Sequence, residues 1–196
     1  MSVSTSAFYG KELNGKYFFS AETATEQAEL WVTDGTPQGT KMVKDIYSQT
    51  NFASSPRNFE VLNGKLFFTA KTFEHGEELW VSDGTTEGTK LVKDIYPGNK
   101  GYVTSQLIAF NNKIFFAASD KASNKSIELW ESDGTEAGTV LFKDINLDYR
   151  DANPKDFYIF DNKLYFNATH YQSGTELYVS DGTPEGTKMV QDLNPG

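Results

Sequence analysis

An all-β fold is predicted for this 196-residue chain by three observations. The string Asp-Gly-Thr recurs at Asp34, Asp83, Asp133 and Asp181, at spacings of 49, 50 and 48 residues, so that four repeats account for the whole length. Each repeat contains four short β-like runs separated by Gly, Asn and Asp residues. No window sustains the spacing of apolar residues at i, i+3, i+4 and i+7 that an amphipathic helix would require. The chain is therefore expected to consist of repeated antiparallel sheets.

The second repeat shows the first two strands of each unit. The first run is Phe59 to Leu62, and it ends at Asn63-Gly64, a dipeptide that favours a hairpin turn with positive φ angles. The second run is Lys65 to Ala70, which is rich in β-forming Phe. Because a two-residue turn separates the two runs, we expect them to pair as an antiparallel hairpin.

The third and fourth strands of this repeat are expected at Glu78 to Ser82 and Thr89 to Ile95. They are joined by the turn from Asp83 to Gly88, whose glycines and side-chain oxygens suit a tight connection. Four strands in about 49 residues match one blade of a β-propeller. The sequence therefore predicts a four-bladed β-propeller with four antiparallel strands per blade. We expect one domain over 1–196, with repeats at about 6–47, 55–96, 104–146 and 153–196.

Runs of consecutive apolar residues support this architecture, because neighbouring blades cover both faces of a propeller sheet. Leu66-Phe67-Phe68 and Leu79-Trp80-Val81 are such runs. Trp31, Trp80 and Trp130 recur at one position of the third strand, where a large aromatic residue is expected to pack between blades. The alternative interpretation is that these three tryptophans form a row of rings on which sugars stack. In the first strands, Phe59, Val61, Ile108, Phe110, Tyr158 and Phe160 are expected to line a central channel.

Charge and composition narrow the classes of partner. The chain has 18 basic and 27 acidic residues and a net charge of −9, so nucleic acid and anionic membranes would be repelled. It has no cysteine, which excludes disulfides and thiolate metal sites. No apolar run approaches the ~20 residues of a membrane-spanning helix. We therefore expect neither nucleic-acid binding nor membrane insertion.

The segment ELW-x-x-DGT-x-x-GT occurs at 29–40, 78–89 and 128–139, and the fourth copy has Tyr178 in place of tryptophan. This segment resembles the ELWxxDGT repeat family of bacterial proteins, and the resemblance covers all four units. It implies propeller blades of large secreted or surface-attached proteins, and hence an extracellular or cell-surface location. It implies no catalytic residues.

The four Asp residues of the repeated turns have two interpretations. An Asp followed by Gly-Thr can organise a turn by accepting hydrogen bonds from backbone amides. Carboxylates and loop carbonyls also suit Ca²⁺, but each turn lacks the alternating oxygen ligands of a calcium loop. We therefore expect a structural role and no cofactor, with Ca²⁺ as the alternative. The Asp residues that end the fourth strands, such as Asp94, are expected to cap or pair locally.

The connections that differ between repeats are where a ligand site is expected. In an up-and-down blade, the uniform turns after the first and third strands lie at one end, and the irregular connections lie at the other. Aromatic rings beside hydrogen-bond donors are typical of glycan or protein recognition. The alternative is that the rings fold back and cover the core. The candidate ligand-binding residues are Phe52, Arg57, Phe73, His75, Tyr102, Tyr149, Arg150, His170 and Tyr171.

The leading functional hypothesis is a non-enzymatic module that binds a glycan or protein through these loops. The chain has two histidines and no Ser/His/Asp order or HExxH motif, so no catalytic or metal-binding residues are assigned. The alternatives are a structural spacer without a discrete ligand and a polysaccharide hydrolase or lyase, for which paired carboxylates would be needed. We expect a monomer, or a dimer that forms a larger, eight-bladed ring.

Overall fold

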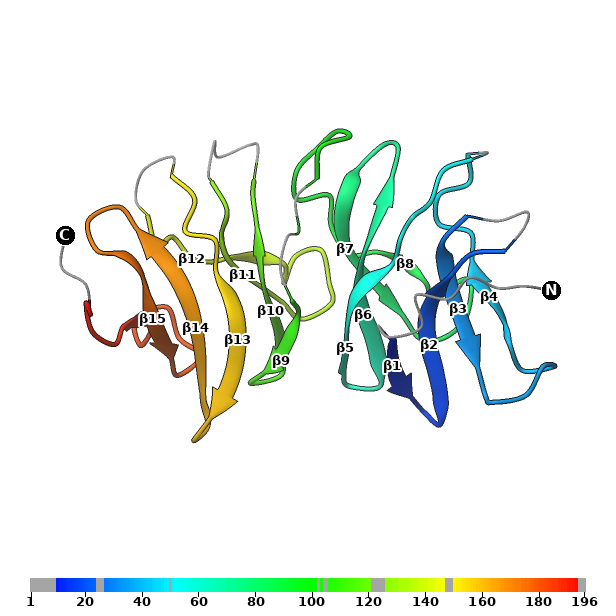
Figure 1. The fold of residues 1–196 in the computed structure, drawn as a ribbon, viewed down its shortest axis with the longest axis horizontal. Helices are drawn as coiled ribbons and strands as arrows, with labels where there is room; N and C mark the ends of the chain where they lie inside the picture. Colours follow the sequence, from blue (N-terminus) through cyan, green and yellow to red (C-terminus); the bar gives the residue numbers. More distant parts are fainter. Residues whose placement is uncertain are drawn as a thin grey trace. The chain divides into compact units, whose positions relative to one another are not determined.

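The computed structural model describes residues 10–23, 27–49, 51–101, 103, 106–120, 126–146 and 150–193, and these form an all-β fold (Figure 1). Four antiparallel sheets are present, and each is built from four strands that are consecutive in the chain. We call these sheets blades 1 to 4. The predicted fold class, four propeller blades of four antiparallel strands each, is therefore confirmed. Within the described residues no helix is long and apolar enough to cross a membrane.

The strand bounds follow the sequence repeat. Blade 1 comprises β1 (Gly10–Leu13), β2 (Lys16–Ala21), β3 (Glu29–Thr33) and β4 (Lys41–Lys44). Blade 2 comprises β5 (Arg57–Leu62), β6 (Lys65–Thr72), β7 (Gly76–Ser82) and β8 (Lys90–Leu91). Blade 3 comprises β9 (Ile108–Phe110), β10 (Lys113–Ala118), β11 (Glu128–Ser132) and β12 (Val140–Lys143). Blade 4 comprises β13 (Lys155–Phe160), β14 (Lys163–His170), β15 (Gly174–Ser180) and β16 (Lys188–Met189).

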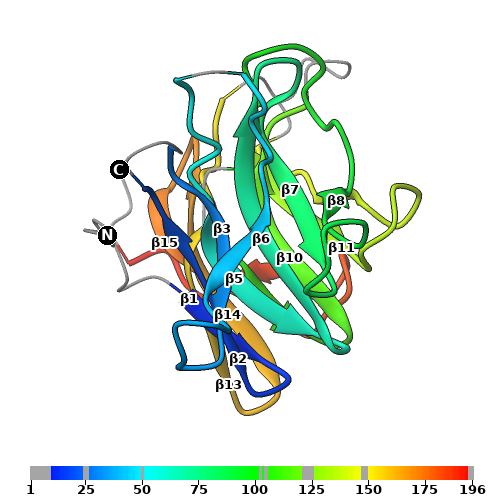
Figure 2. The same cartoon turned by 90° about the vertical axis from the view of Figure 1, so that its right-hand side faces the viewer.

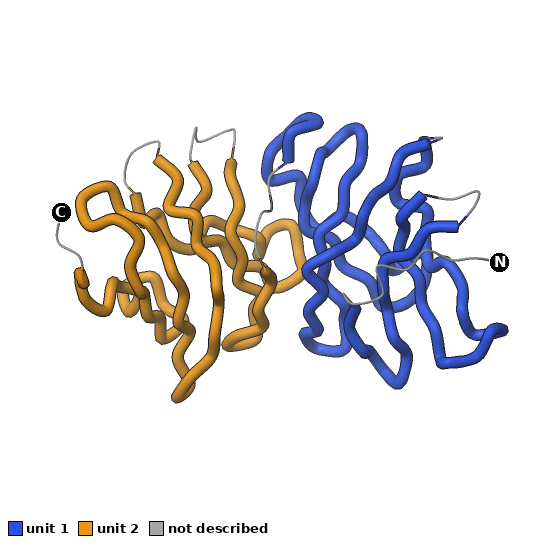
Figure 3. The backbone as a smooth tube through the Cα atoms, viewed as in Figure 1, with its two compact units in different colours: residues 1–101 blue, residues 102–196 orange. Residues whose placement is uncertain are grey.

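The chain divides into two compact units of two blades each (Figure 3). Unit 1 is residues 1–101 and contains blades 1 and 2, and unit 2 is residues 102–196 and contains blades 3 and 4. Within unit 1, β5, β6 and β7 of blade 2 can be followed side by side in Figures 1 and 2. The single-domain organisation over 1–196 stays a prediction.

The hairpin turns between the first and second strands have the predicted backbone conformation. Asn63 and Gly64 both have positive φ angles, 51° and 69°, and Asp161 and Asn162 take the same conformation without a glycine. Two successive residues with positive φ give the turn twist that matches right-twisted strands. The Asn-Gly interpretation is thus confirmed, and Asn and Asp can replace the glycine because their short polar side chains tolerate this region.

The fourth strands are shorter than the sequence predicts. In blade 2 the ladder is confined to Lys90–Leu91, whereas Thr89 to Ile95 was expected. The reason is a buried carboxyl group that takes over the role of the ladder. Glu78 Oε1 accepts a hydrogen bond from the backbone N–H of Tyr96 at 2.9 Å, beyond the end of the strand. Glu29 and Glu128 do the same for the N–H groups of Ile46 and Ile145, both at 2.8 Å.

The core of unit 1 lies between its two blades. Leu13, Phe18, Leu30, Val32, Val43 and Ile46 of blade 1 pack against Leu66, Phe68, Ala70 and Trp80 of blade 2. We call the blade face that packs on the next blade along the chain its leading face, and the opposite face its trailing face. Trp80 therefore lies in interblade packing, as predicted. Burial of this layer stabilises the unit by about 25 cal/mol per Å² of apolar area removed from water.

Unit 2 repeats this arrangement with other residues. The leading face of blade 3 contributes Phe110, Phe115, Leu129, Phe142 and Ile145, and the trailing face of blade 4 contributes Leu164, Phe166, Ala168 and Tyr178. Tyr178 stacks on Phe166 with ring centroids 5.6 Å apart, so it takes the place of the tryptophan. Among the residues expected to line a channel, Phe110 lies in this core.

Polar contacts at the Asp-Gly-Thr turn join the blades of each unit. In unit 1, Lys44 Nζ of blade 1 donates to the carbonyl oxygen of Thr89 (2.6 Å), and Thr86 Oγ1 donates to the carbonyl of Val43 (2.7 Å). In unit 2, Lys143 Nζ of blade 3 donates to the carbonyl of Pro184 at 3.0 Å. The turn of one blade is therefore a docking element for the blade before it.

Candidate functional site

The candidate site lies at the variable end of blade 2, where two oppositely charged pairs meet the strand ends. Arg57, the first residue of β5, donates from Nη2 to Glu77 Oε2 on β7 at 2.5 Å. His75, in the turn between β6 and β7, contacts Asp94 through Nδ1 and Oδ2 at 2.8 Å. The turn is tight because Gly76 has a φ of 65°, and Thr72 Oγ1 accepts from the N–H of His75. We call Arg57, His75, Glu77 and Asp94 the blade 2 cluster.

This cluster is partly buried, so its charges interact more strongly than on an open surface. The side chains of Arg57 and His75 are 49% and 36% exposed, whereas that of Glu77 is 11% exposed, so the guanidinium and the imidazole are the accessible members. With the proton on Nδ1 donated to Asp94, the Nε2 atom of His75 makes no hydrogen bond with a described residue. A ring held in this way can accept or donate a proton at Nε2.

A fully buried carboxyl group, Glu78, underlies the cluster. Burial, followed by the charges of Asp94 and Glu77, raises its pKa to about 8, against the hydrogen bonds from Tyr96 and Ile95, which lower it. Its Oε2 atom is buried and has no hydrogen-bond partner among the described residues. Because Glu78 is fully buried, a substrate cannot contact it, and its role is structural.

Two exposed phenylalanines flank the same end of unit 1. Phe73 lies in the turn before His75, and Phe52 lies in the connection from blade 1 to blade 2; each is 54% exposed. Phe52 stacks on Tyr47, with ring centroids 5.2 Å apart. Neither ring is folded into the core, so the alternative in which these loop rings cover the core is wrong for Phe52 and Phe73.

A second group of predicted residues comes together in unit 2. Arg150 lies over the ring of Tyr171 at 5.3 Å from its centroid, and His170 packs on the same tyrosine with centroids 4.7 Å apart. Asn146 Oδ1 fixes the turn by accepting from the N–H of Tyr171 at 3.0 Å. We call Arg150, His170 and Tyr171 the blade 4 cluster. Tyr102 and Tyr149, also predicted as ligand-binding residues, lie outside the described residues.

Sequence reasoning missed Glu77 as a member of the site. The sequence does distinguish it, because a charged residue precedes the ELW-type segment in repeat 2 alone. The other repeats have Ala28, Ile127 and Thr175 at this position. Asp94 pairs locally, as predicted, but its partner His75 was not foreseen. The burial of the first glutamate of each ELW-type segment, Glu29, Glu78, Glu128 and Glu176, was also missed, because charged residues are rarely fully buried.

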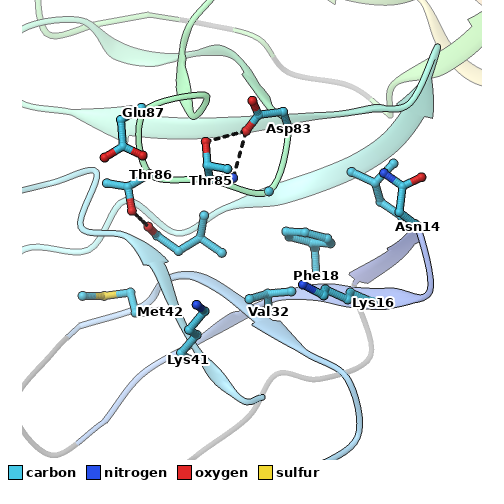
Figure 4. A pocket seen from close by; sticks show the side chains of 13 residues that line it. Asn14, Lys16, Phe18, Val32, Lys41, Met42, Asp83, Thr85, Thr86 and Glu87 are labelled. Carbon is cyan, nitrogen blue, oxygen red and sulfur yellow. Dashed lines mark hydrogen bonds between the residues drawn. The ribbon is translucent and has the colours of Figure 1, made fainter. Parts of the chain in front are cut away.

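An interblade pocket of about 520 Å³ lies in unit 1, away from these clusters (Figure 4). The floor includes Phe18, Val32 and Met42 of blade 1, and the turn from Asp83 to Glu87 of blade 2 forms one wall. A pocket of about 390 Å³ occurs at the same place in unit 2, beside Phe115 and the turn from Gly182 to Glu185. Because it recurs where each turn docks, we attribute this pocket to the repeat geometry.

The Asp-Gly-Thr turns have the predicted structural arrangement. In all four, Oδ1 of the Asp accepts from both the N–H and the Oγ1–H of the Thr two residues later, at 2.7 to 2.9 Å. The hydrogen bond from the Thr side chain is the main reason why the pKa of each Asp is lowered. Among the described residues no group of three or more His, Asp or Glu side chains is placed to hold a metal ion.

Comparison with known proteins yields structural matches at low sequence identity. No protein-family model matches the chain, and no curated protein sequence matches it either. A puromycin hydrolase, solved as an S511A mutant complexed with PGG, matches with a TM-score of 0.59 and 12% identity over 92% of this chain. A protein of unknown function from Dyadobacter fermentans DSM 18053 matches with a TM-score of 0.51 and 14% identity, covering 95% of this chain and 72% of that one.

The chain spans 27% of the puromycin hydrolase structure that it matches. An α-L-arabinofuranosidase from Clostridium thermocellum ATCC 27405 also matches, at a TM-score of 0.44 and 13% identity, over 92% of this chain and 71% of that one. The prediction that the chain is not an enzyme is corrected by the match to the puromycin hydrolase, because the fold occurs in an enzyme. At 12% identity the likeness shows the fold and no particular activity.

Proposed function

We propose that this chain provides the glycan-binding and proton-transferring site of an enzyme that degrades a polysaccharide, by hydrolysis or by elimination. The observation that carries the proposal is the His75–Asp94 pair beside the Arg57–Glu77 pair at the variable end of blade 2. The occurrence of hydrolases with the same fold supports it at the level of architecture. The resemblance to the ELWxxDGT family supports an extracellular or cell-surface location as part of the same proposal.

The chemistry assigned to the cluster follows from the accessible ring nitrogen. Asp94 holds the imidazole of His75, so that Nε2 can take a proton from an attacking water or from a sugar carbon next to a carboxylate. Arg57 has five N–H donors, and the pair with Glu77 leaves donors for sugar hydroxyls or a uronate carboxylate. Phe73 offers an exposed ring face on which a pyranose can stack.

Asymmetry among the repeats favours a functional role for this cluster. A residue required by the scaffold is expected in every blade, whereas a reaction site needs one constellation. The position of His75 holds Glu26, Lys125 and Ser173 in the other repeats, and that of Glu77 holds Ala28, Ile127 and Thr175. His75 and Glu77 are thus additions to the repeat, and His75 pairs with Asp94, which recurs as Asp45, Asp144 and Asp192.

The test is an activity screen of the full chain on neutral and uronate-containing polysaccharides. Hydrolysis is followed by new reducing ends, and elimination by the ultraviolet absorbance of unsaturated ends. We expect His75→Gln and Asp94→Asn to lower kcat/KM by about 10²-fold or more, because a positioned general base contributes on that order. Asp45→Asn, at the equivalent position of blade 1, is the matched control and should retain activity.

Two results would overturn the proposal. One is that neither polysaccharide class yields reducing or unsaturated ends and neither binds to the chain in calorimetry. The other is that Asp94→Asn and Asp45→Asn lose activity equally, because a loss shared by both positions reports damage to the repeat. Circular dichroism of each variant checks that the fold is retained.

The blade 4 cluster favours a second glycan contact in unit 2. Arg150 and His170 present donors beside the exposed ring of Tyr171, which is the arrangement expected for sugar stacking. We propose that it binds the polysaccharide away from the reacting bond. Tyr171→Ala should raise KM or the dissociation constant several-fold and leave kcat unchanged; a fall in kcat alone would contradict this role.

A further inference from the structure

The leading face of blade 4 carries large apolar side chains that no described residue covers. Tyr158, Phe160, Val190 and Leu193 are 66%, 63%, 51% and 72% exposed, and Leu177 is 39% exposed. The equivalents of Phe160, Val190 and Leu193 are buried in both units. Leu13 and Phe110 take the place of Phe160, Val43 and Phe142 that of Val190, and Ile46 and Ile145 that of Leu193. An apolar patch of this kind marks an interaction surface.

We propose that a second copy of this chain covers this face, through the trailing face of its blade 1. Each unit shows what fits a leading face: the trailing face of a following blade, supplied by Leu66, Phe68 and Trp80 in unit 1 and by Leu164, Phe166 and Tyr178 in unit 2. Blade 1 has Tyr17, Phe19 and Trp31 at these positions. The trailing face of blade 1 therefore has the residue types that are needed to cover the leading face of blade 4.

The trailing face of blade 1 is itself incompletely covered. Tyr17 is exposed and stacks on Phe19, with ring centroids 6.1 Å apart. Its turn hydroxyl pair, Thr33 and Thr40, is open to solvent, whereas the equivalent pairs Ser82–Thr89 and Ser180–Thr187 are buried. One chain thus has an exposed leading face on blade 4 and a partly exposed trailing face on blade 1, where Tyr17 is 36% exposed and Phe19 is 7% exposed.

The polar contacts of a blade junction can also form in this interface. Within the units, Lys44 and Lys143 donate to carbonyl groups of the following turn, those of Thr86 and Thr89 in unit 1 and that of Pro184 in unit 2. The equivalent residue of blade 4 is Gln191, whose amide is also a donor, and the equivalent acceptor of blade 1 is the carbonyl of Pro37. The interface is heterologous, because it joins different faces of the two copies.

The experiment is the mass of the full chain in solution, measured by sedimentation equilibrium over a concentration series. We expect the wild-type chain to reach at least twice the single-chain mass. Val190→Glu and Leu193→Glu on the leading face, and Tyr17→Glu on the trailing face, should each return the mass to that of one chain. Val140→Lys, an exposed apolar position on β12 outside this face, is the matched control and should associate like wild type.

Mixing two variants tests the polarity of the interface. Val190→Glu keeps a native trailing face and Tyr17→Glu keeps a native leading face, so an equimolar mixture should form a 1:1 complex although neither variant associates alone. A wild-type chain that stays at single-chain mass at every concentration would overturn the proposal, and it would point to cover by the chain's own blade 1. Association of Val190→Glu and Leu193→Glu at wild-type strength would overturn it as well. Because all variants lie outside the blade 2 cluster, these outcomes are independent of the proposed activity.

Discussion

Gly88 is held beside Asp83 in the Asp-Gly-Thr turn of blade 2, with no room for a side chain. A Cβ atom at Gly88 would lie 2.0 Å from Asp83 Oδ1, and the same conflict recurs at Gly39, Gly138 and Gly186. We predict that Gly88→Ala lowers the free energy of unfolding by about 1–3 kcal/mol, because overpacking forces the turn to shift. Urea denaturation of the full chain measures this cost.

The companion variant Asp83→Ala separates the steric conflict from the loss of hydrogen bonds. Asp83→Ala alone should cost about 1 kcal/mol, since it removes the acceptor of the Thr85 N–H and hydroxyl. In the double variant the cost of Gly88→Ala should shrink, because the carboxylate with which the Cβ would collide is gone. Strict additivity of the two costs would contradict this account of the turn.

Glu78 makes stability depend on pH in the direction opposite to a surface carboxylate. Burial raises its pKa to about 8 in the folded chain, whereas the unfolded chain ionises near the ordinary value of 4.5. Between pH 4.5 and about pH 8, unfolding therefore releases a proton from Glu78. The protonated Glu78 contributes its full share to stability below the unfolded-state pKa, and this share is lost as the pH rises through the folded-state pKa. Glu128, with a pKa raised to about 7 chiefly by burial, acts in the same sense.

We predict that the free energy of unfolding falls between about pH 5 and pH 8, and that Glu78→Gln reduces this slope. Urea titrations at several pH values measure it. Glu87→Gln, at an exposed position of the neighbouring turn, is the control and should leave the slope unchanged. A slope that is the same in Glu78→Gln and wild type would show that another group titrates.

At the scale of the strands, the sequence predicts the bounds of the first three strands of a blade better than those of the fourth. In blade 2, β5, β6 and β7 contain their predicted ranges and extend them by two residues at one end, because Arg57, Thr72 and Gly76 continue the ladder outside the apolar runs. The predicted end of the fourth strand is wrong because the apolar residues continue beyond the end of the ladder. Val92 is bonded to Leu79, but the chain after it is held by the Glu78 carboxyl group, an interaction that periodicity does not reveal.

One lysine in each unit donates hydrogen bonds across the junction between the two blades. Lys44 of β4 donates to the carbonyl groups of Thr86 and Thr89, and an apolar side chain there would leave these acceptors to water. We predict that Lys44→Met lowers the free energy of unfolding by about 1 kcal/mol. Lys41→Met is the control, because Lys41 is an exposed residue at the start of the same strand. A larger loss in Lys41→Met would contradict this assignment.

Residue type and loop position were enough to nominate most members of the two clusters. Arg57, His75, Arg150, His170 and Tyr171 were named from their types and their place in variable connections, and the structure groups them into two clusters. Glu77 was missed because its pairing with Arg57 depends on the sheet order, in which β6 lies between β5 and β7. Such pairings across strands follow from the fold and cannot be derived from composition alone.

At the scale of the whole molecule, the division into two units predicts where a core substitution is felt. Phe68 is fully buried between blades 1 and 2. Phe68→Ala should cost about 3–5 kcal/mol by removing this ring. Residue-resolved hydrogen exchange should then show faster exchange of β2, β3, β6 and β7 than of the strands of unit 2. Equal acceleration in both units would show that the chain unfolds as one cooperative body.

The sequence repeat predicted four blades but not their grouping into pairs. All four repeats share the same apolar positions, so the periodicity treats every blade junction alike. The grouping arises from packing over long sequence separations: Leu13 and Trp80 belong to the core of unit 1, and Phe110 and Tyr178 to that of unit 2. The pattern within a single repeat carries no information about such distances.

Among the described strands, each sheet comes from one contiguous stretch of the chain, and none is borrowed from a neighbouring repeat. The hydrogen-bonded unit and the unit of coding sequence therefore coincide. A tandem duplication of a single segment of this length would add a whole blade, with one leading and one trailing face, and would leave every existing ladder intact. A gene that encodes such a chain can therefore gain or lose one blade at a time, and the number of blades can change in evolution without a new fold.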